Sequence, residues 1–138
     1  MEIKWRIWIE KDGKHVIGKG GAEILRAIKE EGSIAAASKR LGMSYKYVWN
    51  YLKKIEGSVG KVVEKVRGGR EGGKTVLTTI GEEILSTYDY YESMAESIFS
   101  SEILEGRVKE GKLIINGEID DGDKVLVLKK KCPKDFKS

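Results

Sequence analysis

Apolar residues alternate with mostly charged ones at the start of the chain. The odd-numbered positions 3–9 are all Ile or Trp, and this period of two predicts a half-buried strand. The pair Asp12-Gly13 comes next, and such a pair tolerates the positive φ angles of a tight hairpin turn. The pattern therefore predicts an N-terminal β-hairpin that returns over residues 15–17.

Helical spacing replaces this alternation further along the chain. Residues 18–21 are rich in glycine and separate the hairpin from a helix predicted over residues 22–31 and ended by Gly32. The buried stripe of this helix is expected to consist of Ile24, Leu25, Ala27 and Ile28.

Two further helical patterns flank Gly42, which supplies the permissive backbone of a tight turn. Ser33 and Ser44 stand where their hydroxyl groups can cap these two helices. The alanines at residues 35–37 are small enough to let the second helix cross closely. The second helix is predicted to end before a loop at residues 57–60. Its inner, apolar face consists of Val48, Tyr51, Leu52 and Ile55.

The outer face of the second helix is basic and also carries an amide. It consists of Tyr45, Lys46, Trp49, Asn50, Lys53 and Lys54. A short helix, a glycine turn and a second helix with such a face follow the plan of a helix-turn-helix, whose second helix enters the major groove of DNA. DNA is therefore the first candidate partner. Trp49 itself is expected to be a packed aromatic rather than a groove contact.

Two strands with a basic, glycine-rich connection come next. Residues 62–66 and 75–77 have the apolar character of strands, and the connection contains Arg67, Arg70 and Lys74. Glycines let backbone N–H groups approach phosphates, and the cations neutralise the phosphate charge. The segment is therefore predicted to be a wing that contacts the DNA backbone.

The same connection formally matches the nucleotide-binding pattern G-x-x-x-x-G-K-[ST] at residues 68–75. In a phosphate loop the Lys-Ser/Thr pair opens a helix, whose N-terminus surrounds the phosphates. Here the residues after Lys74 are predicted to form a strand. We therefore expect a wing and no nucleotide hydrolysis.

A long helix is predicted from a cap at Thr78 or Thr79 to about Phe99. Its apolar residues recur at spacings of four and three, as in a coiled-coil seam. The seam residues are Ile84, Tyr88, Tyr91, Ala95 and Ile98. So small a domain does not cover a helix of this length, and we expect the seam to form a homodimer interface. Packing against the N-terminal hairpin is the alternative, and both can hold.

Beyond residue 106 the pattern changes to short strands and turns. Turns are predicted at Asn116-Gly117 and Asp121-Gly122. The strands that these turns join are predicted at residues 112–115, 118–119 and 124–128.

The length of 138 residues suits one domain with an appendage. We predict a DNA-binding and dimerisation domain at residues 1–99 and a small β-rich extension with a basic tail at residues 100–138. Residues 33–75 contain ten Lys or Arg against three acids, whereas residues 76–105 contain seven acids and no Lys or Arg. One end is therefore suited to phosphate, although two ordinary solvated faces would have the same composition.

The sequence holds few of the residues that catalysis or metal binding requires. It has one histidine, His15, and one cysteine, Cys132, so no internal disulfide, zinc site or nucleophilic triad can be assembled. The acidic residues 120–123 lack the spacing of a calcium loop, and no apolar run is long enough to span a membrane. We therefore expect a cytoplasmic protein, not an enzyme, without metal or cofactor. Charged residues make up 35% of the chain, a bias typical of thermophilic proteins.

The order of these elements resembles the N-terminal DNA-binding domain of ModE-type molybdate-responsive regulators and, more remotely, that of LysR-type regulators. The motifs that carry the resemblance lie between about Ile3 and Phe99: Asp12-Gly13, Gly18-Lys19-Gly20, Gly32-Ser33-Ile34, Gly42-Met43-Ser44-Tyr45-Lys46 with Trp49, and the wing through Leu77-Thr78 and Gly81. The resemblance implies an α+β fold: a winged helix-turn-helix with an N-terminal β-hairpin, a long dimerisation helix and a small C-terminal β segment.

The resemblance also implies a transcription regulator that binds double-stranded, palindromic DNA as a homodimer. It does not imply molybdate binding, because ModE-type proteins sense this oxyanion with a tandem C-terminal sensor domain, for which the segment after Phe99 is too short. Two alternatives stay open. One is a chromatin-like or RNA-binding basic protein without sequence selectivity, and the other is a partner-binding module that heterodimerises with a full-length regulator.

Within this interpretation, the amide of Asn50 and the ammonium group of Lys46 are the expected contacts to base edges. Ser44 and Tyr45 lie at the start of the helix and are expected to bond phosphates. Tyr47 either packs or bonds a phosphate. The remaining phosphate contacts are predicted to be Lys53, Lys54, Arg67, Arg70 and Lys74.

Overall fold

The computed structural model describes residues 1–70 and 72–130 of the chain. The chain divides into two units, Met1–Ser101 and Glu102–Ser138. Cys132 and most of the predicted basic tail lie outside the described residues.

The first unit opens with the predicted hairpin. Strand β1 (Ile9–Lys11) pairs antiparallel with β2 (Lys14–Ile17), and the turn residues Asp12 and Gly13 have φ angles of +51° and +71°. The first strand is shorter than predicted, because it begins at Ile9 and not at residue 3. The ladder ends at the pair Ile9↔Ile17, and the chain then turns into a helix, so β2 offers no partner to the residues before Ile9.

Helix α1 (Lys19–Glu31) begins three residues earlier than the sequence pattern indicated. Gly21, predicted to lie in a break, is part of the first turn of α1. A Cβ atom at this position would lie only 2.8 Å from Cγ2 of Ile17, so glycine allows the helix to start directly against β2. The predicted stripe on α1 is buried, and Gly32 ends the helix at a φ of +74°.

Helices α2 (Ile34–Leu41) and α3 (Tyr45–Val59) form the predicted pair around Gly42, whose φ is +65°. The hydroxyl of Ser33 accepts a hydrogen bond from the backbone N–H of Ala36 at 3.0 Å. The hydroxyl of Ser44 accepts one from the N–H of Tyr47 at 3.1 Å. Both predicted caps are therefore confirmed.

Two details of this helix pair differ from prediction. Of the three alanines in α2, only Ala37 is fully buried, while Ala35 is exposed. Helix α3 continues through the predicted loop and ends at Gly60, whose N–H bonds the carbonyl of Glu56 at 2.9 Å. Val59 packs against the core, and this contact carries the helix across Gly57.

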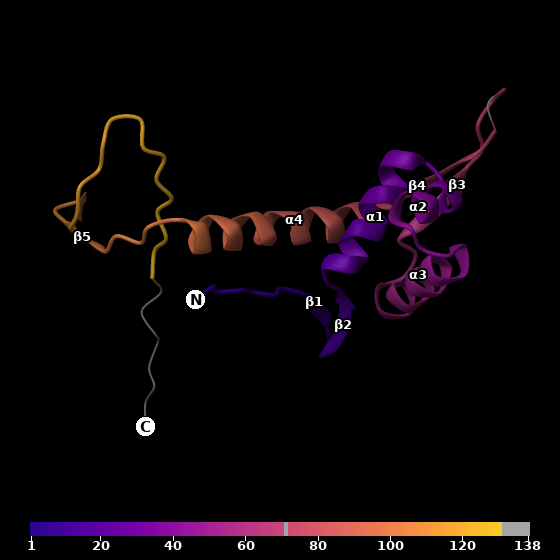
Figure 1. The fold of residues 1–138 in the computed structure, drawn as a ribbon, viewed down its shortest axis with the longest axis horizontal. Helices are drawn as coiled ribbons and strands as arrows, with labels where there is room; N and C mark the ends of the chain where they lie inside the picture. Colours follow the sequence, from indigo (N-terminus) through magenta and orange to yellow (C-terminus); the bar gives the residue numbers. More distant parts are fainter. Residues whose placement is uncertain (71, 131–138) are drawn as a thin grey trace. The chain divides into compact units, whose positions relative to one another are not determined.

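The predicted wing is an antiparallel ribbon of β3 (Val63–Val66) and β4 (Lys74–Leu77), with Val66 opposite Lys74 at the outer end. Figure 1 shows the ribbon reaching out beyond the three helices. The N–H of Thr75 bonds the carbonyl of Gly32 at 2.8 Å and ties β4 to the end of α1.

Helix α4 (Thr79–Ser100) follows the wing. Thr78 is its cap, because the Thr78 hydroxyl accepts from the N–H of Gly81 at 3.2 Å. Two ion pairs join α4 to α1: Arg26 with Asp89, and Lys29 with Glu82 at 2.6 Å.

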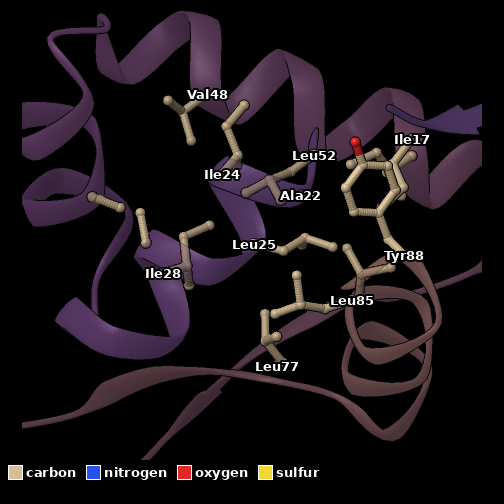
Figure 2. Close-up of a cluster of buried hydrophobic side chains, with 14 of the residues drawn as sticks. Ile17, Ala22, Ile24, Leu25, Ile28, Val48, Leu52, Leu77, Leu85 and Tyr88 are labelled. Atoms are coloured by element: carbon tan, nitrogen blue, oxygen red, sulfur yellow. The ribbon is translucent and has the colours of Figure 1, made fainter. Parts of the chain in front are cut away.

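One hydrophobic core holds these elements together, with α1 at its centre. Figure 2 shows the side chains of α1 facing those of α3 on one side and those of β4 and α4 on the other. The core residues labelled there are Ile17, Ala22, Ile24, Leu25, Ile28, Val48, Leu52, Leu77, Leu85 and Tyr88. The α+β winged helix-turn-helix predicted from the sequence is thus the fold of the first unit.

The second unit contains one hairpin, formed by β5 (Gly106–Lys109) and β6 (Lys112–Ile115). Its turn is Glu110-Gly111, whose φ angles are +52° and +74°. The predicted hairpin turn at Asn116-Gly117 is therefore wrong, because β6 already pairs with the strand before it. The N–H of Asn116 instead bonds the carbonyl of Glu105 at 3.1 Å.

The residues after this hairpin form a turn without flanking strands. The turn predicted at Asp121-Gly122 is present, with the N–H of Asp123 bonded to the carbonyl of Asp120 at 3.1 Å. The strands predicted at residues 118–119 and 124–128 are absent from the described chain. Their apolar side chains are exposed, so no packing against other residues holds these segments in extended form.

Candidate nucleic-acid interface

The outer face of α3 is exposed as predicted. Val48, Leu52 and Ile55 are at most 1% exposed and fix the inner face, so the residues between them in the helical period point outward. The exposed residues are Tyr45, Lys46, Trp49, Asn50, Lys53 and Lys54. Caps at one end and core contacts along its length hold this face rigidly on the domain.

Three of these side chains form a stack along the helix surface, which we call the aromatic ladder: Tyr45, Trp49 and Lys53. The rings of Tyr45 and Trp49 have centroids 6.5 Å apart and planes 10° apart. Nζ of Lys53 lies 4.5 Å from the centroid of the Trp49 ring. Trp49 is 40% exposed. Its ring therefore packs on neighbouring side chains at the surface and does not lie in the core.

Glu56 holds Lys53, the residue at the C-terminal end of the aromatic ladder. Its carboxylate accepts from Nζ of Lys53 at 2.9 Å and from the backbone N–H of Val62 at 3.3 Å. Burial by itself would raise the pKa of Glu56, but these hydrogen bonds outweigh it and lower the pKa below the ordinary value. Lys53 is thus paired with Glu56 inside the same helix, while its side chain stays 52% exposed.

Lys46 and Lys54 differ from Lys53, because no ion pair is seen for either within residues 1–70 and 72–130. Lys46 and Lys54 are both exposed, and they stand four residues before and four residues after Asn50 on α3. These three side chains provide donors, and in the case of Asn50 also an acceptor, at the surface.

Two hydroxyl groups at the start of α3 have defined surroundings. The Ser44 oxygen is occupied as a cap acceptor, so only its proton remains to be donated to a phosphate. Tyr47 is 52% exposed and its ring leans against Tyr51, with centroids 6.2 Å apart. Burial raises the pKa of Tyr51, which lies against Gly21 of α1.

The three cations predicted to contact phosphates, Arg67, Arg70 and Lys74, are all exposed on the wing, and so is Lys65 of β3. Lys74 opens strand β4 and not a helix, so the phosphate-loop pattern is not a phosphate loop in structure. The bond from the N–H of Thr75 to the carbonyl of Gly32 ties the wing to the end of α1.

The five seam residues of α4 have unequal surroundings. Tyr88 is 3% exposed and belongs to the domain core, and Ile84 is partly buried against that core. Tyr91 is 60% exposed, whereas Ala95 and Ile98 are half-buried. The N-terminal segment also reaches this helix, because Trp5 stacks on Phe99 with centroids 5.0 Å apart. Trp5 lies before the hairpin that the structure forms, so this contact shows α4 meeting the N-terminal segment and not the hairpin itself.

Sequence reasoning missed Glu56 and the aromatic ladder. The i,i+4 spacing of Tyr45, Trp49 and Lys53 and the i,i+3 spacing of Lys53 and Glu56 were the available signals. Among the residues described, no three His, Cys, Asp or Glu side chains gather as metal ligands. No helix in the described part of the chain is both long and apolar enough to cross a membrane.

Comparisons with known proteins agree with this geometry. Residues 21–82 match the family of bacterial regulatory helix-turn-helix proteins of the lysR type. The chain is 38% identical over 77 residues to the transcriptional regulator ModE of Haemophilus influenzae, which is 55% of this chain and 30% of that protein. It is 33% identical over 94 residues to the molybdenum-pterin-binding protein MopB of Rhodobacter capsulatus, covering 67% of this chain and 34% of MopB.

A further relative is the DNA-binding transcriptional dual regulator ModE of Escherichia coli, 32% identical over 55% of this chain and 29% of that protein. The chain spans about a third of the length of the curated relatives it matches. The crystal structure of ArgP from Mycobacterium tuberculosis matches at 26% identity over 58% of this chain and 28% of ArgP, with a TM-score of 0.44. Residues 21–82 therefore match the helix-turn-helix domain of lysR-type regulatory proteins, and the chain is similar to ModE-type regulators.

Proposed function

We propose that this chain is a sequence-specific, DNA-binding transcription regulator that acts as a homodimer. The observation that carries the proposal is the outer face of α3, where Lys46, Asn50 and Lys54 are exposed on a helix fixed by its cap and by the core. An α-helix with such a face fits the major groove, and amide and ammonium groups discriminate between base edges there.

The distribution of charge supports DNA as the partner. The block of ten Lys or Arg at residues 33–75 covers α2, α3 and the wing, whereas the acidic block at residues 76–105 covers α4. DNA phosphates would meet the first block and be repelled by the second. Lys46 and Asn50 are proposed to contact bases. The proposed phosphate contacts are Ser44, Tyr45, Lys54, Arg67, Arg70 and Lys74, with a weaker one from Lys53.

The homodimer is proposed to form through the exposed part of α4, with Tyr91 as its central residue. Regulators with one such domain per protomer read two half-sites, so dimerisation would match the two-fold symmetry of a palindromic operator. We also infer a cytoplasmic, non-enzymatic role, because the family and the relatives that the chain matches are transcription regulators. Molybdate binding is not part of the proposal.

The decisive experiment is fluorescence-anisotropy binding to the promoter fragment upstream of the chain's own gene and to a shuffled duplex, across a salt series. A preference of about 10³-fold or more for the native fragment at moderate salt is expected for a specific regulator. Equal affinity for both duplexes that falls steeply with salt would identify a non-specific basic protein, since such binding is nearly all counterion release.

Two substitutions separate base contacts from phosphate contacts. Asn50→Ala is expected to relax sequence preference at one position, at a loss of about 1–3 kcal/mol. Lys74→Ala is expected to weaken binding to all sequences alike and to lower the salt slope by about one. Equal losses on all sequences for both variants would contradict this assignment of roles.

A further inference from the structure

Two large aromatic side chains on the outer face of α3 have no role in the fold. Tyr45 is 52% exposed and Trp49 40% exposed, and neither belongs to the core cluster. Exposed aromatic rings on a surface otherwise formed by charged and amide groups are typical of binding sites.

The aromatic ladder fixes the Trp49 ring in position. Tyr45 stacks nearly parallel to it, Lys53 lies over the ring, and Glu56 holds Lys53. Glu56 in turn is bonded to the backbone of Val62. A side chain ordered before binding loses less conformational entropy on association, so a fixed apolar surface contributes more to affinity than a mobile one.

The position of the aromatic ladder on α3 indicates which part of the DNA it would contact. Asn50 is the next residue after Trp49, and Lys46 the next after Tyr45, so the ladder lies beside the groups proposed to read base edges. In an intact duplex the bases are stacked and present only their edges in the major groove. The one apolar group on those edges is the 5-methyl group of thymine.

We propose that Trp49, supported by Tyr45, is a specificity-determining residue that contacts thymine methyl groups in the major groove. This inference rests on the proposed function, because it requires α3 to enter the groove. It makes thymine a required base at one or more positions of each half-site. Lys53 then acts mainly as a support for the Trp49 ring and only weakly as a phosphate contact.

The test begins with a duplex selected from a random library by repeated rounds of binding to the full chain. The selected duplex is then made with thymine or with uracil throughout, which removes only the methyl groups. The wild-type chain is expected to bind the uracil duplex about four-fold more weakly for each contacted methyl group. Trp49→Ala is expected to bind the thymine duplex more weakly and to lose the difference between the two duplexes.

Two further variants act as controls. Tyr47→Ala removes an aromatic of α3 that is as exposed as Tyr45 but lies outside the aromatic ladder. This variant should keep the thymine preference. Trp49→Phe keeps an aromatic ring and should keep most of the preference. Far-UV circular dichroism of each variant verifies the helix content.

Two results would overturn the inference while leaving the regulator intact. The first is equal affinity of the wild-type chain for the thymine and uracil duplexes. The second is an unchanged thymine preference in Trp49→Ala. Failure of the library to enrich any sequence would instead overturn the proposed function, and this inference with it.

Discussion

Gly20 and Gly21 are neighbours in the first turn of α1, yet their surroundings are opposite. A Cβ atom on Gly21 would lie 2.8 Å from Cγ2 of Ile17 and 3.1 Å from Cε1 of Tyr51, whereas no atom lies within 4 Å of one on Gly20. Gly21 of α1 is therefore a point where side chains of β2 and α3 leave no room for a Cβ atom.

This difference predicts opposite effects of the same substitution. Gly21→Ala is expected to destabilise the domain by about 1–3 kcal/mol, because the core would be overpacked. Gly20→Ala, the matched control, is expected to stabilise it by about 0.5 kcal/mol through the lower entropy of the unfolded chain and the better helix propensity of alanine. Urea unfolding followed by circular dichroism measures both, and two effects of the same sign would refute the packing described at Gly21.

Glu56 makes the stability of the domain depend on pH. Its side chain is 12% exposed, and its pKa is lowered by the bonds from Lys53 and Val62 despite burial. A carboxyl group with a lowered pKa in the folded state adds stability above its unfolded pKa, and this stability is lost as the pH falls through the folded value. The loss therefore begins below the ordinary value of 4.5.

Glu56→Gln is expected to reduce the free energy of unfolding by about 1 kcal/mol at pH 7, where the wild-type carboxylate is charged. The difference between wild type and variant should stay constant above the ordinary pKa of 4.5 and shrink as the pH is lowered below it. Denaturant unfolding at several pH values measures it. A difference that also stays constant below the ordinary pKa would mean that the charge of Glu56 does not contribute.

At the scale of elements, α2 depends on its cap. The helix has only eight residues, and isolated helices of this length are unstable in water. The Ser33 hydroxyl satisfies the N–H of Ala36, and the buried Ala37 and Ile34 dock the helix on the core. Cap and packing together fix the angle at which α3 leaves the turn.

Ser33→Ala is therefore expected to destabilise the domain by about 1 kcal/mol. Ser86→Ala is a suitable control, because the exposed Ser86 hydroxyl bonds only the carbonyl of Glu83 within its own helix, and it should change stability by less than about 0.5 kcal/mol. Thermal unfolding of both variants compares them. A Ser33→Ala variant as stable as the control would show that packing alone holds α2.

At the scale of the whole molecule, the proposed dimer depends on one stretch of α4. Tyr90 and Tyr91 are neighbours with equal exposure of 60%, but only Tyr91 lies on the predicted seam. Tyr88 and Ile84 of the same seam are used inside the protomer, which leaves Tyr91, Ala95 and Ile98 for a second copy.

Tyr91→Glu is expected to dissociate the homodimer, because it would place two like charges in an apolar contact. Tyr90→Glu adds the same charge beside the seam and is expected to leave the dimer intact. Light scattering after size-exclusion chromatography gives the mass of each variant. Dissociation by both substitutions, or by neither, would argue against the seam as the interface.

Local signals in the sequence were sufficient for most of the first unit. Asp12-Gly13, Ser33, Gly42 and Ser44 act through hydrogen bonds and φ angles within a few residues of themselves. The inner face of α3 followed equally well from its period, because burial of Val48, Leu52 and Ile55 needs only one apolar surface to pack on.

Other features depended on partners far away in the sequence. The start of β1 was set by where β2 turns into α1, and the end of α3 by the contact of Val59 with the core. Tyr88 fits the period of a seam on α4, but it belongs to the core cluster and is therefore buried within the protomer. In the second unit, the hairpin turn is Glu110-Gly111 and not Asn116-Gly117, although Asn-Gly is the stronger turn signal. The reason is that β6 pairs with β5, the strand before it, and Asn116-Gly117 then lies beyond the end of the hairpin.

The sequence by itself thus determined the order of elements, their caps and the polarity of each helix face, because these depend on interactions within one or two helical turns. Only the tertiary structure decided which apolar residues are covered within the chain and which remain exposed, because burial depends on what another element places opposite. The outer face of α3 illustrates both: its basic character and the spacing of the aromatic ladder were visible in the sequence, whereas the bond from the N–H of Val62 that holds Glu56 required the folded chain.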